Sequence, residues 1–320
     1  MSSVIGVDLG GTKVALATLH DRVLGESMTE PTELASGTTL IDQLVELVGR
    51  ARDDSLQAVG IGVPSVVEFE TGRVVSSVNI PLVDVPLRQT LSARLGVPVF
   101  VDNDATVAAL AEAHDEQLNL VAKHLVMLTI GTGVGGGFVL GGRIYRGATG
   151  GAGEIGHTII GLNVATALPA GGRFPQPPSL EYLASGQALD RLAAQAAGQD
   201  PQSPLGRLLA EGRPVLGADA VEATLAGDPV AARMVEIWAE RIGIGIANAI
   251  NTFEPQEVVI GGGAARAGDL LLEPAKRIAS GYVLPGLRNR TTIRLARWGV
   301  RAGVLGAALL AVHELEDSAR

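Results

Sequence analysis

Three consecutive polar side chains interrupt an apolar segment, "VFVDNDATVAA". Residues 98–101 have the pattern of a buried strand, and residues 105–111 can place their apolar side chains on one side of a helix. Asp102, Asn103 and Asp104 are therefore expected on the turn between them. Asn and Asp are preferred helix N-caps, and capping alone is one explanation. A cap needs only one such side chain, so at least one carboxylate is expected to point elsewhere.

Glycine clusters follow three apolar strands, at residues 8–13, 131–135 and 261–263. Glycine leaves backbone amides unobstructed, so each cluster could face a phosphate, although an ordinary tight turn is the alternative at each place. The segment "GTGVGG" matches the dinucleotide fingerprint, but a strand follows it instead of the required helix. A P-loop motif is absent from the sequence. The pattern therefore favours phosphate-facing hairpins.

Composition excludes several classes of protein. The 320 residues carry a formal charge of -9 and only 3% aromatic side chains, which argues against a nucleic-acid partner. The chain has no cysteine, so disulfides, thiolate nucleophiles and zinc sites built on cysteine are impossible. Its start lacks a secretory signal, and the apolar run "GVLGAALLAV" is shorter than the roughly 20 residues of a membrane span. We expect a cytoplasmic protein without a membrane partner.

Strands alternate with helices along the chain, which indicates an α/β architecture. Two units of strand, glycine turn and strand lie more than a hundred residues apart, so an internal duplication is expected, with each unit opening its own domain. The predicted strands are residues 4–9, 14–19, 125–130, 138–140, 257–262 and 292–296. The predicted helices are residues 40–51, 105–112, 179–197, 229–253, 269–280 and 304–314, and residues 161–178 are a predicted loop.

The ordered motifs "DLGGTK", "VDNDA", "IGTGVGGG", "EIGH" and "VVIGGG" resemble the ROK family of sugar kinases and related repressors, over nearly the whole chain. The resemblance implies an actin-like ATPase (ribonuclease H-like) fold. Its two lobes each open with a β-hairpin, and the active site is expected in the cleft between them. A small lobe is expected at residues 1–120, with the helix at 303–316 packing back on it, and a large lobe at residues 121–302.

The resemblance also implies roles for the polar residues. Asp104 corresponds to the catalytic base, which accepts the proton of the hydroxyl being phosphorylated, and Asn103 corresponds to a sugar ligand. Further sugar contacts are implied for Asn79, Glu154, His157 and Glu181. A salt bridge to an arginine is the structural alternative for Glu154, and a hydrogen-bonded core histidine is the alternative for His157.

ATP and Mg²⁺ are the implied cofactors. Asp8 is suited to holding Mg²⁺ through water, because this ion prefers oxygen ligands and keeps part of its hydration shell. Lys13 could add charge, but a solvated lysine is equally consistent with the sequence. The nucleotide would contact Gly10, Gly11, Thr12 and Lys13 on the first hairpin, Gly131, Thr132, Gly133 and Gly135 on the second, and Gly261, Gly262 and Gly263 through its adenosine.

The zinc motif of the family is missing. Most members carry C-x-C-G-x-x-G-C-x-E, whose three cysteines bind zinc together with the histidine. Counting back from Glu181, those positions are Gly172, Phe174 and Ser179. No zinc site of that type can form, so another group must orient His157. A second departure is Ser65, where glycine is common, and this serine is expected to narrow the pocket.

The resemblance implies an ATP-dependent hexose kinase that phosphorylates glucose to glucose 6-phosphate. Fructose, mannose, N-acetylmannosamine or a cyclitol are alternative substrates, and the motifs do not decide among them. A non-catalytic sugar-binding regulator is the alternative of another class. ROK repressors carry a helix-turn-helix domain before the first hairpin, and the position of Asp8 is expected to leave no room for one. The resemblance also implies a homodimer or homotetramer.

Overall fold

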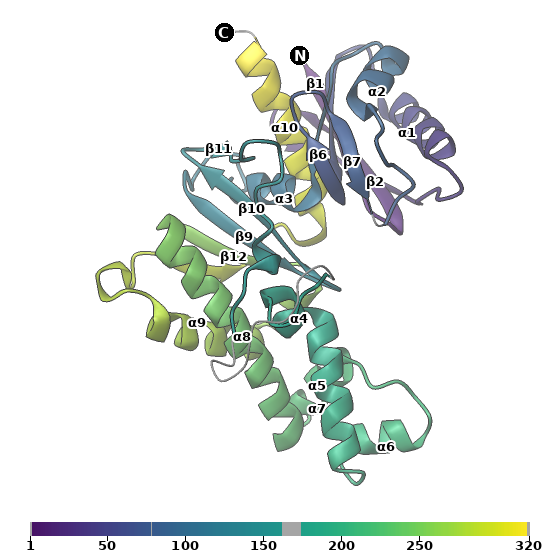
Figure 1. The fold of residues 1–320 in the computed structure, drawn as a ribbon. Coiled ribbons are helices and arrows are strands. Elements are labelled where there is room, and N and C mark those ends of the chain that lie inside the picture. Colours follow the sequence, from purple (N-terminus) through teal and green to yellow (C-terminus); the bar gives the residue numbers. More distant parts are fainter. Residues whose placement is uncertain (1, 78, 162–173, 319–320) are drawn as a thin grey trace. The chain divides into compact units, whose positions relative to one another are not determined.

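A computed structural model describes residues 2–77, 79–161 and 174–318 (Figure 1). The strands are β1 (Ser3–Leu9), β2 (Lys13–His20), β3 (Val23–Leu24), β4 (Met28–Pro31), β5 (Leu56–Val63), β6 (Ser65–Glu68), β7 (Arg73–Ser77), β8 (Val99–Asn103), β9 (Leu125–Ile130), β10 (Val134–Leu140), β11 (Arg143–Ile144), β12 (Glu257–Gly261) and β13 (Thr292–Leu295). The α-helices are α1 (Gly37–Ala51), α2 (Leu87–Leu95), α3 (Asp104–Glu112), α4 (Leu180–Ala184), α5 (Gly186–Gln199), α6 (Pro204–Ala210), α7 (Gly217–Leu225), α8 (Pro229–Phe253), α9 (Asp269–Tyr282) and α10 (Ala302–Ser318).

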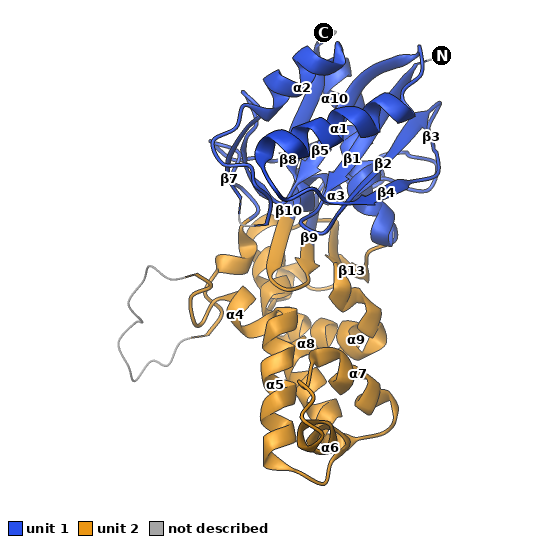
Figure 2. Cartoon of the chain, turned by 90° about the vertical axis from the view of Figure 1, so that its right-hand side faces the viewer, with its two compact units in different colours: residues 1–127, 137–153, 297–320 blue, residues 128–136, 154–296 orange. Residues whose placement is uncertain are grey.

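Two compact units divide the described chain, and each is built from segments that are distant in sequence (Figure 2). Unit 1 comprises residues 1–127, 137–153 and 297–320. Unit 2 comprises residues 128–136 and 154–296. The division runs across strands β9 and β10, because the chain leaves unit 1 within β9, after residue 127, and returns to it within β10, at residue 137. The C-terminal helix α10 belongs to unit 1.

The sheet of unit 1 has the strand order β3-β2-β1-β5-β8, with β4 paired to β2. Strands β1 and β2 are antiparallel, whereas β1, β5 and β8 are mutually parallel. Asp8 lies opposite Gly62, and Gly62 lies opposite Asp102. The two aspartates therefore occupy one row at the carboxyl edge of the sheet, about 10 Å apart at two strand spacings. Ligand sites of open α/β sheets lie at such edges.

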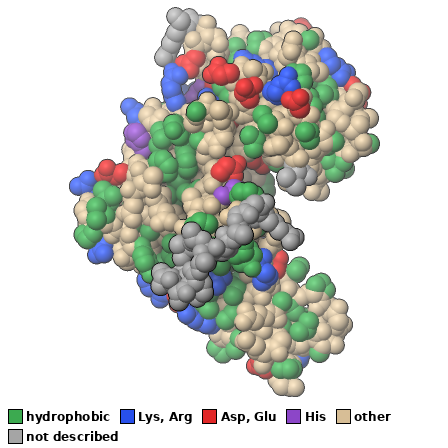
Figure 3. Space-filling model, in the orientation of Figure 1, with side chains coloured by type: hydrophobic (Ala, Val, Ile, Leu, Met, Phe, Trp, Pro, Cys, Tyr) green, Lys and Arg blue, Asp and Glu red, His purple; other side chains and the backbone are tan. Residues whose placement is uncertain are grey.

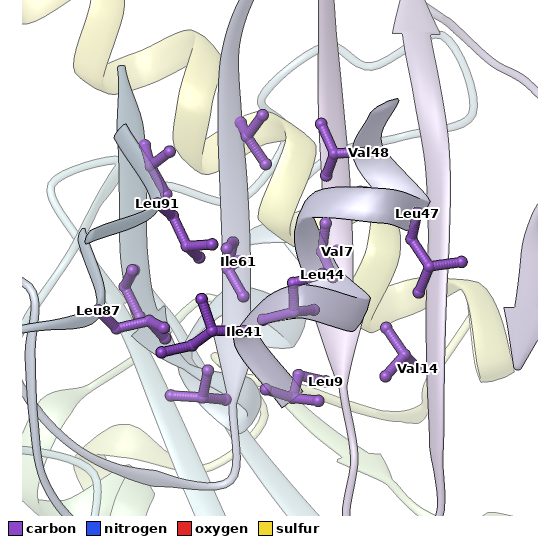
Figure 4. Close-up of a cluster of buried hydrophobic side chains, with 14 of the residues drawn as sticks. Val7, Leu9, Val14, Ile41, Leu44, Leu47, Val48, Ile61, Leu87 and Leu91 are labelled. Carbon is purple, nitrogen blue, oxygen red and sulfur yellow. The ribbon is translucent and has the colours of Figure 1, made fainter. Parts of the chain in front are cut away.

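Helices cover both faces of this sheet. Helix α1 begins with a capping box, in which the Ser36 hydroxyl accepts from the Thr39 amide and the Thr39 hydroxyl accepts from the Ser36 amide. Its buried stripe, including Leu44 and Leu47, packs on β1, β2 and β5 together with α2 (Figure 4). Helix α10 packs on β1 and β5 from the other side. A side chain at Gly60 would collide with the backbone of α10, so glycine permits this close packing.

The second sheet has the strand order β11-β10-β9-β12-β13, in which β12 and β13 are parallel. Helices α8 and α9 pack against each other beside it, and α4, α5, α6 and α7 are the other described α-helices of unit 2. Helix α8 begins at Pro229, and the preceding Asp228 accepts hydrogen bonds from two amides of the first turn. The two sheets confirm the predicted α/β class.

Most of the predicted elements are confirmed, with two corrections. The helix predicted at residues 179–197 is two helices, because the chain breaks at Ser185. That serine caps α5, and the indole of Trp238 donates to the carbonyls of Ala184 and Ser185. The turn expected at residues 102–104 is also absent, since β8 continues through Asn103 and α3 begins at the next residue. The predicted loop at 161–178 lies partly outside the described residues.

On the face shown in Figure 3, lysine and arginine side chains lie in small groups, some of which border acidic side chains. Among the residues that the structure describes, none of the helices combines the length and the apolar character that a membrane span requires.

Candidate active site

The three polar residues that end β8 have three different environments. Asn103 is the N-cap of α3, because its Oδ1 accepts from the amides of Ala105 and Thr106 at 3.0 and 3.2 Å. Its Nδ2 donates to the Ser65 carbonyl at 3.4 Å. Asp104 is the first residue of α3, is partly exposed, and accepts from the Ala105 amide at 2.7 Å. Capping therefore accounts for Asn103 and leaves the two carboxylates to be explained.

Asp102 is buried in an ion pair. The Nε of Arg146 donates to its Oδ2 at 2.7 Å, and its Oδ1 accepts from the Asn103 amide at 2.9 Å. Burial raises the pKa of the Asp102 carboxyl, while the charge and hydrogen bond of Arg146 oppose this rise. Asp102 is thus a structural carboxylate, and Asp104 is the carboxylate of this segment that remains partly exposed.

The first glycine turn joins β1 to β2 at the same edge of the sheet. The Gly10 amide donates to the Lys13 carbonyl at 2.9 Å, and the Thr32 hydroxyl donates to the Gly10 carbonyl at 2.7 Å. Asp8 is partly buried, and loss of hydration raises the pKa of its carboxyl, while the positive charge of Lys13 opposes the rise. Such a carboxylate is stabilised by a nearby cation, so Asp8 fits a magnesium ion held through water.

Two further residues of unit 1 lie against this hairpin. A Cβ at Gly11 would come within 2.9 Å of the Cβ of Asn79, so the exposed Asn79 lies beside the turn. A side chain at Gly303, in the first turn of α10, would collide with the carboxylate of Asp8. Unit 1 therefore brings together Asp8, the first glycine turn and Asn79, with Asn103 and Asp104 at the same carboxyl edge.

The second glycine turn, between β9 and β10, is held by Glu181. The carboxylate of Glu181 at the start of α4 accepts from the Val134 amide at 2.9 Å. A side chain at Gly133 would collide with that carboxylate, which explains the glycine there. The Gly186 amide donates to the Gly131 carbonyl at 2.7 Å and links the turn to the start of α5. Glu181, expected as a sugar contact, therefore also supports a predicted phosphate-binding turn.

The third glycine turn lies against the second. Gly262 has a positive φ of 77°, which favours glycine, and a Cβ there would lie 2.5 Å from the Ile130 carbonyl. Ile130 is the last residue of β9, so the turn after β12 meets the start of the turn at residues 131–133. Unit 2 thus brings two of the three predicted nucleotide-contacting turns together.

Glu154 and His157 form the remaining predicted pair of unit 2. Glu154 is exposed, and its Oε2 lies 3.5 Å from Nε2 of His157. The His157 Nδ1 is buried and has no hydrogen-bond partner among the described residues. The ring of Phe174 stands edge-on to the imidazole, with centroids 5.2 Å apart. His157 is therefore not the hydrogen-bonded core histidine of the structural alternative, and Glu154 pairs with it instead of with an arginine.

A zinc ion does not fit this site. Phe174 and Ser179 stand at two of the motif's cysteine positions, and Gly172 at the third lies outside the described residues. Ser179 caps α4, because its hydroxyl accepts from the Tyr182 amide at 3.2 Å. The described residues contain no group of three or more His, Asp or Glu side chains that could hold a metal. An aromatic ring thus contacts the histidine where the family motif has a cysteine.

Sequence reasoning missed Arg146, together with Phe69 and Glu314, which complete its surroundings. No motif spacing pointed to these residues, because they lie 77 or more positions from one another. The signal that could have found them is Asp102, the second carboxylate of this segment. If buried, it needs a cation as a partner.

Comparison with known proteins identifies the family. The sequence pattern described as "ROK family" matches residues 4–314. The chain belongs to the ROK family. A glucokinase of Halalkalibacterium halodurans is 35% identical over 98% of this chain and 96% of its own length.

Two solved ROK structures share the fold over nearly the whole chain. A ROK hexokinase from Thermus thermophilus is 36% identical, with a TM-score of 0.77 over 98% of this chain and 99% of that one. A ROK family glucokinase from Streptomyces griseus, solved in complex with glucose and AMPPNP, is 30% identical, with a TM-score of 0.78 over 98% of this chain and 100% of that one. The predicted actin-like ATPase fold is confirmed.

Proposed function

We propose that this ROK protein is an ATP-dependent kinase that transfers the γ-phosphoryl group to a glucose hydroxyl, forming glucose 6-phosphate. The observation that carries the proposal is that the three polar residues at the end of β8 have three different environments. Asp102 is paired and buried, Asn103 caps α3, and Asp104 stays partly exposed at the carboxyl edge of the sheet. The named relatives, a glucokinase of similar length among them, support glucose as the acceptor.

In this proposal Asp104 is the base. The sugar hydroxyl oxygen attacks the γ-phosphorus, the bond from that phosphorus to the ADP oxygen breaks, and the hydroxyl proton passes to the Asp104 carboxylate. A carboxylate is suited to this step, because phosphoryl transfer needs an oriented hydroxyl more than a strong base. Asn103 would hold the sugar through its amide, whose Nδ2 makes only a long bond of 3.4 Å to Ser65.

The glycine turns would bind the nucleotide through their amides. Gly10, Gly11, Thr12 and Lys13 of unit 1 and Gly131, Thr132, Gly133 and Gly135 of unit 2 would contact the phosphates, and Gly261, Gly262 and Gly263 the adenosine. Asp8 would hold Mg²⁺ through water, and the ion would neutralise charge on the phosphates.

Five side chains would contact the sugar. Asn79 and Asn103 belong to unit 1, whereas Glu154, His157 and Glu181 belong to unit 2. We further propose the lobe boundaries stated above, a homodimer or homotetramer, and a cytoplasmic location, where ATP is available. A kinase for fructose, mannose, N-acetylmannosamine or a cyclitol is the second candidate, since sugar stereochemistry depends on contacts that motifs do not specify.

The test is ADP release from Mg-ATP against a panel of hexoses, amino sugars and inositol, with the wild-type chain, Asp104→Asn and the exposed control Asp54→Asn. We expect turnover with glucose, a kcat reduced by about 10²–10⁴-fold in Asp104→Asn, and wild-type turnover in the control. Glucose affinity, measured by calorimetry, should change little in Asp104→Asn. Preference for another sugar would correct the substrate, and turnover near wild type in Asp104→Asn would remove this residue from the role of base.

A further inference from the structure

We propose that Arg146 is a positioning residue that sets the place of Asp104 through Asp102 and the first turn of α3. This inference rests on the proposed kinase function. Arg146 follows β11, and its side chain reaches the end of β8. Figure 1 shows β11 beside α3 and α10, and contacts between β11 and α3 agree with that view.

The Arg146 guanidinium contacts three side chains. Its Nε donates to Asp102 at 2.7 Å, and its Nη2 donates to Glu314 of α10 at 3.0 Å. The guanidinium carbon lies 3.4 Å from the centroid of the Phe69 ring. A planar cation with several fixed donors can satisfy these partners together, whereas a lysine ammonium on its flexible stem cannot reproduce the arrangement. Arg146 thereby joins the end of β8 to α10.

The ion pair of Arg146 with Asp102 is largely buried, so the loss of either partner is costly. The Asp102 side chain is only 3% exposed and that of Arg146 21% exposed. An ionised carboxylate at such a site needs a paired cation, because removal of one partner leaves a buried charge without compensation. Loss of Arg146 should therefore leave Asp102 either to move towards water or to take up a proton.

Either response changes the support of Asp104. The same Asp102 carboxylate accepts the Asn103 amide through Oδ1, and Asn103 in turn caps α3 through the amides of Ala105 and Thr106. Asp104 lies between these hydrogen-bonded positions, as the first residue of the helix. A shift of Asp102 would therefore move the Asn103 backbone and the first turn of α3, and with them the carboxylate of Asp104, which would receive the proton.

The chain offers a matched control in Arg143. This residue is in β11 and pairs with Asp317 of α10, with one contact of 2.7 Å, so it also joins β11 to α10. Its side chain is 61% exposed, and its ion-pair and hydrogen-bond partner in the described part of the chain is Asp317 and not Asp102. A general weakening of the β11–α10 contact should affect variants of both arginines, whereas positioning of Asp104 should depend on Arg146 alone.

The experiment compares Arg146→Lys, Arg146→Ala and Asp102→Asn with Arg143→Ala, using steady-state kinetics well below each variant's unfolding temperature. We expect kcat to fall by about 10- to 100-fold in the first three variants, because a displacement near 1 Å can cost 10²-fold. KM for ATP and for glucose should change less than threefold (about 0.7 kcal/mol). Arg143→Ala should keep the wild-type kcat, and added guanidinium should partly restore Arg146→Ala.

Hydrogen exchange supplies a readout independent of activity. The amides of Asn103, Ala105 and Thr106 should exchange faster in Arg146→Lys than in Arg143→Ala, at equal global stability. Wild-type kcat and exchange in Arg146→Lys and Asp102→Asn would overturn the inference, as would equal losses in Arg146→Lys and Arg143→Ala. Failure of the wild-type chain to phosphorylate any sugar would instead refute the proposed function, while exchange would still report on the Arg146 contact.

Discussion

The ring of Phe174 stands edge-on to the imidazole of His157, at a centroid distance of 5.2 Å and an interplanar angle of 77°. Phe174 occupies one of the positions at which the ROK zinc motif has a cysteine. The Oε2 of Glu154 also lies 3.5 Å from Nε2 of the imidazole. The histidine is thus oriented by an aromatic contact and a carboxylate, in a chain without cysteine.

Removal of the Phe174 ring should weaken sugar binding. In Phe174→Ala the imidazole loses a contact of about 0.5–1.5 kcal/mol, so we expect KM for glucose to rise about 2- to 12-fold, while KM for ATP stays near wild type. Phe174→Tyr, which keeps the ring, is the matched control and should behave as the wild type. An unchanged glucose KM in Phe174→Ala would show that this ring does not orient His157.

A methyl group at Gly133 should disturb the second glycine turn. It would collide with the Glu181 carboxylate that accepts the Val134 amide, so Gly133→Ala should raise KM for ATP and lower kcat, with a combined loss of about tenfold or more in kcat/KM. Gly198→Ala in α5 is the control, because a Cβ there meets no atom within 4 Å. Steady-state kinetics at varied ATP concentration distinguish the two variants, and equal behaviour would contradict the assigned collision.

Acid should destabilise unit 1 through two histidines whose rings lie side by side at a tilted angle. The rings of His114 and His313 have centroids 5.6 Å apart, and burial lowers the pKa of both imidazoles. In the unfolded chain their pKa lies near 6.5. The unfolded state therefore binds more protons below this pH, and the free energy of unfolding should fall as the pH decreases through about 6.5, until the folded histidines are themselves protonated.

Urea unfolding at a series of pH values between 5 and 8 measures this dependence. The wild-type chain is compared with His313→Gln. Only the slope of the free energy of unfolding against pH is compared, because the substitution also changes packing. The charged neighbours that act on the two rings are Asp115, Arg22, Glu316, Asp317 and Arg143. A variant slope equal to that of the wild type between pH 5 and 6.5 would assign the acid sensitivity to other groups.

Ser65 should be replaceable by alanine with a gain in stability. Its side-chain oxygen is buried and has no hydrogen-bond partner among the described residues. Burial without a partner costs about 1–3 kcal/mol, so Ser65→Ala should raise the free energy of unfolding by about 1 kcal/mol, whereas Ser65→Gly should gain less because glycine adds chain entropy to the unfolded state. Loss of stability in Ser65→Ala would mean that the hydroxyl is hydrogen-bonded.

Local sequence was enough to predict many of the strands and helices, the three glycine turns and the family of this protein. Residues 229–253 could be predicted as a helix because apolar spacing and a capping Asp-Pro pair agree over several turns. The family motifs are equally local, since each places backbone amides or a carboxylate within a few residues of a strand end.

Tertiary structure decided which partner each polar side chain has. Residue type alone does not separate the carboxylates of Asp102 and Asp104. They differ in the folded chain because Arg146, 44 positions from Asp102, pairs with that carboxylate. The contact of Phe174 with His157 and the support of residues 133–134 by Glu181 likewise join residues distant in sequence. Hydrogen bonds and ion pairs act over a few ångströms, and only the folded chain brings these groups within that range.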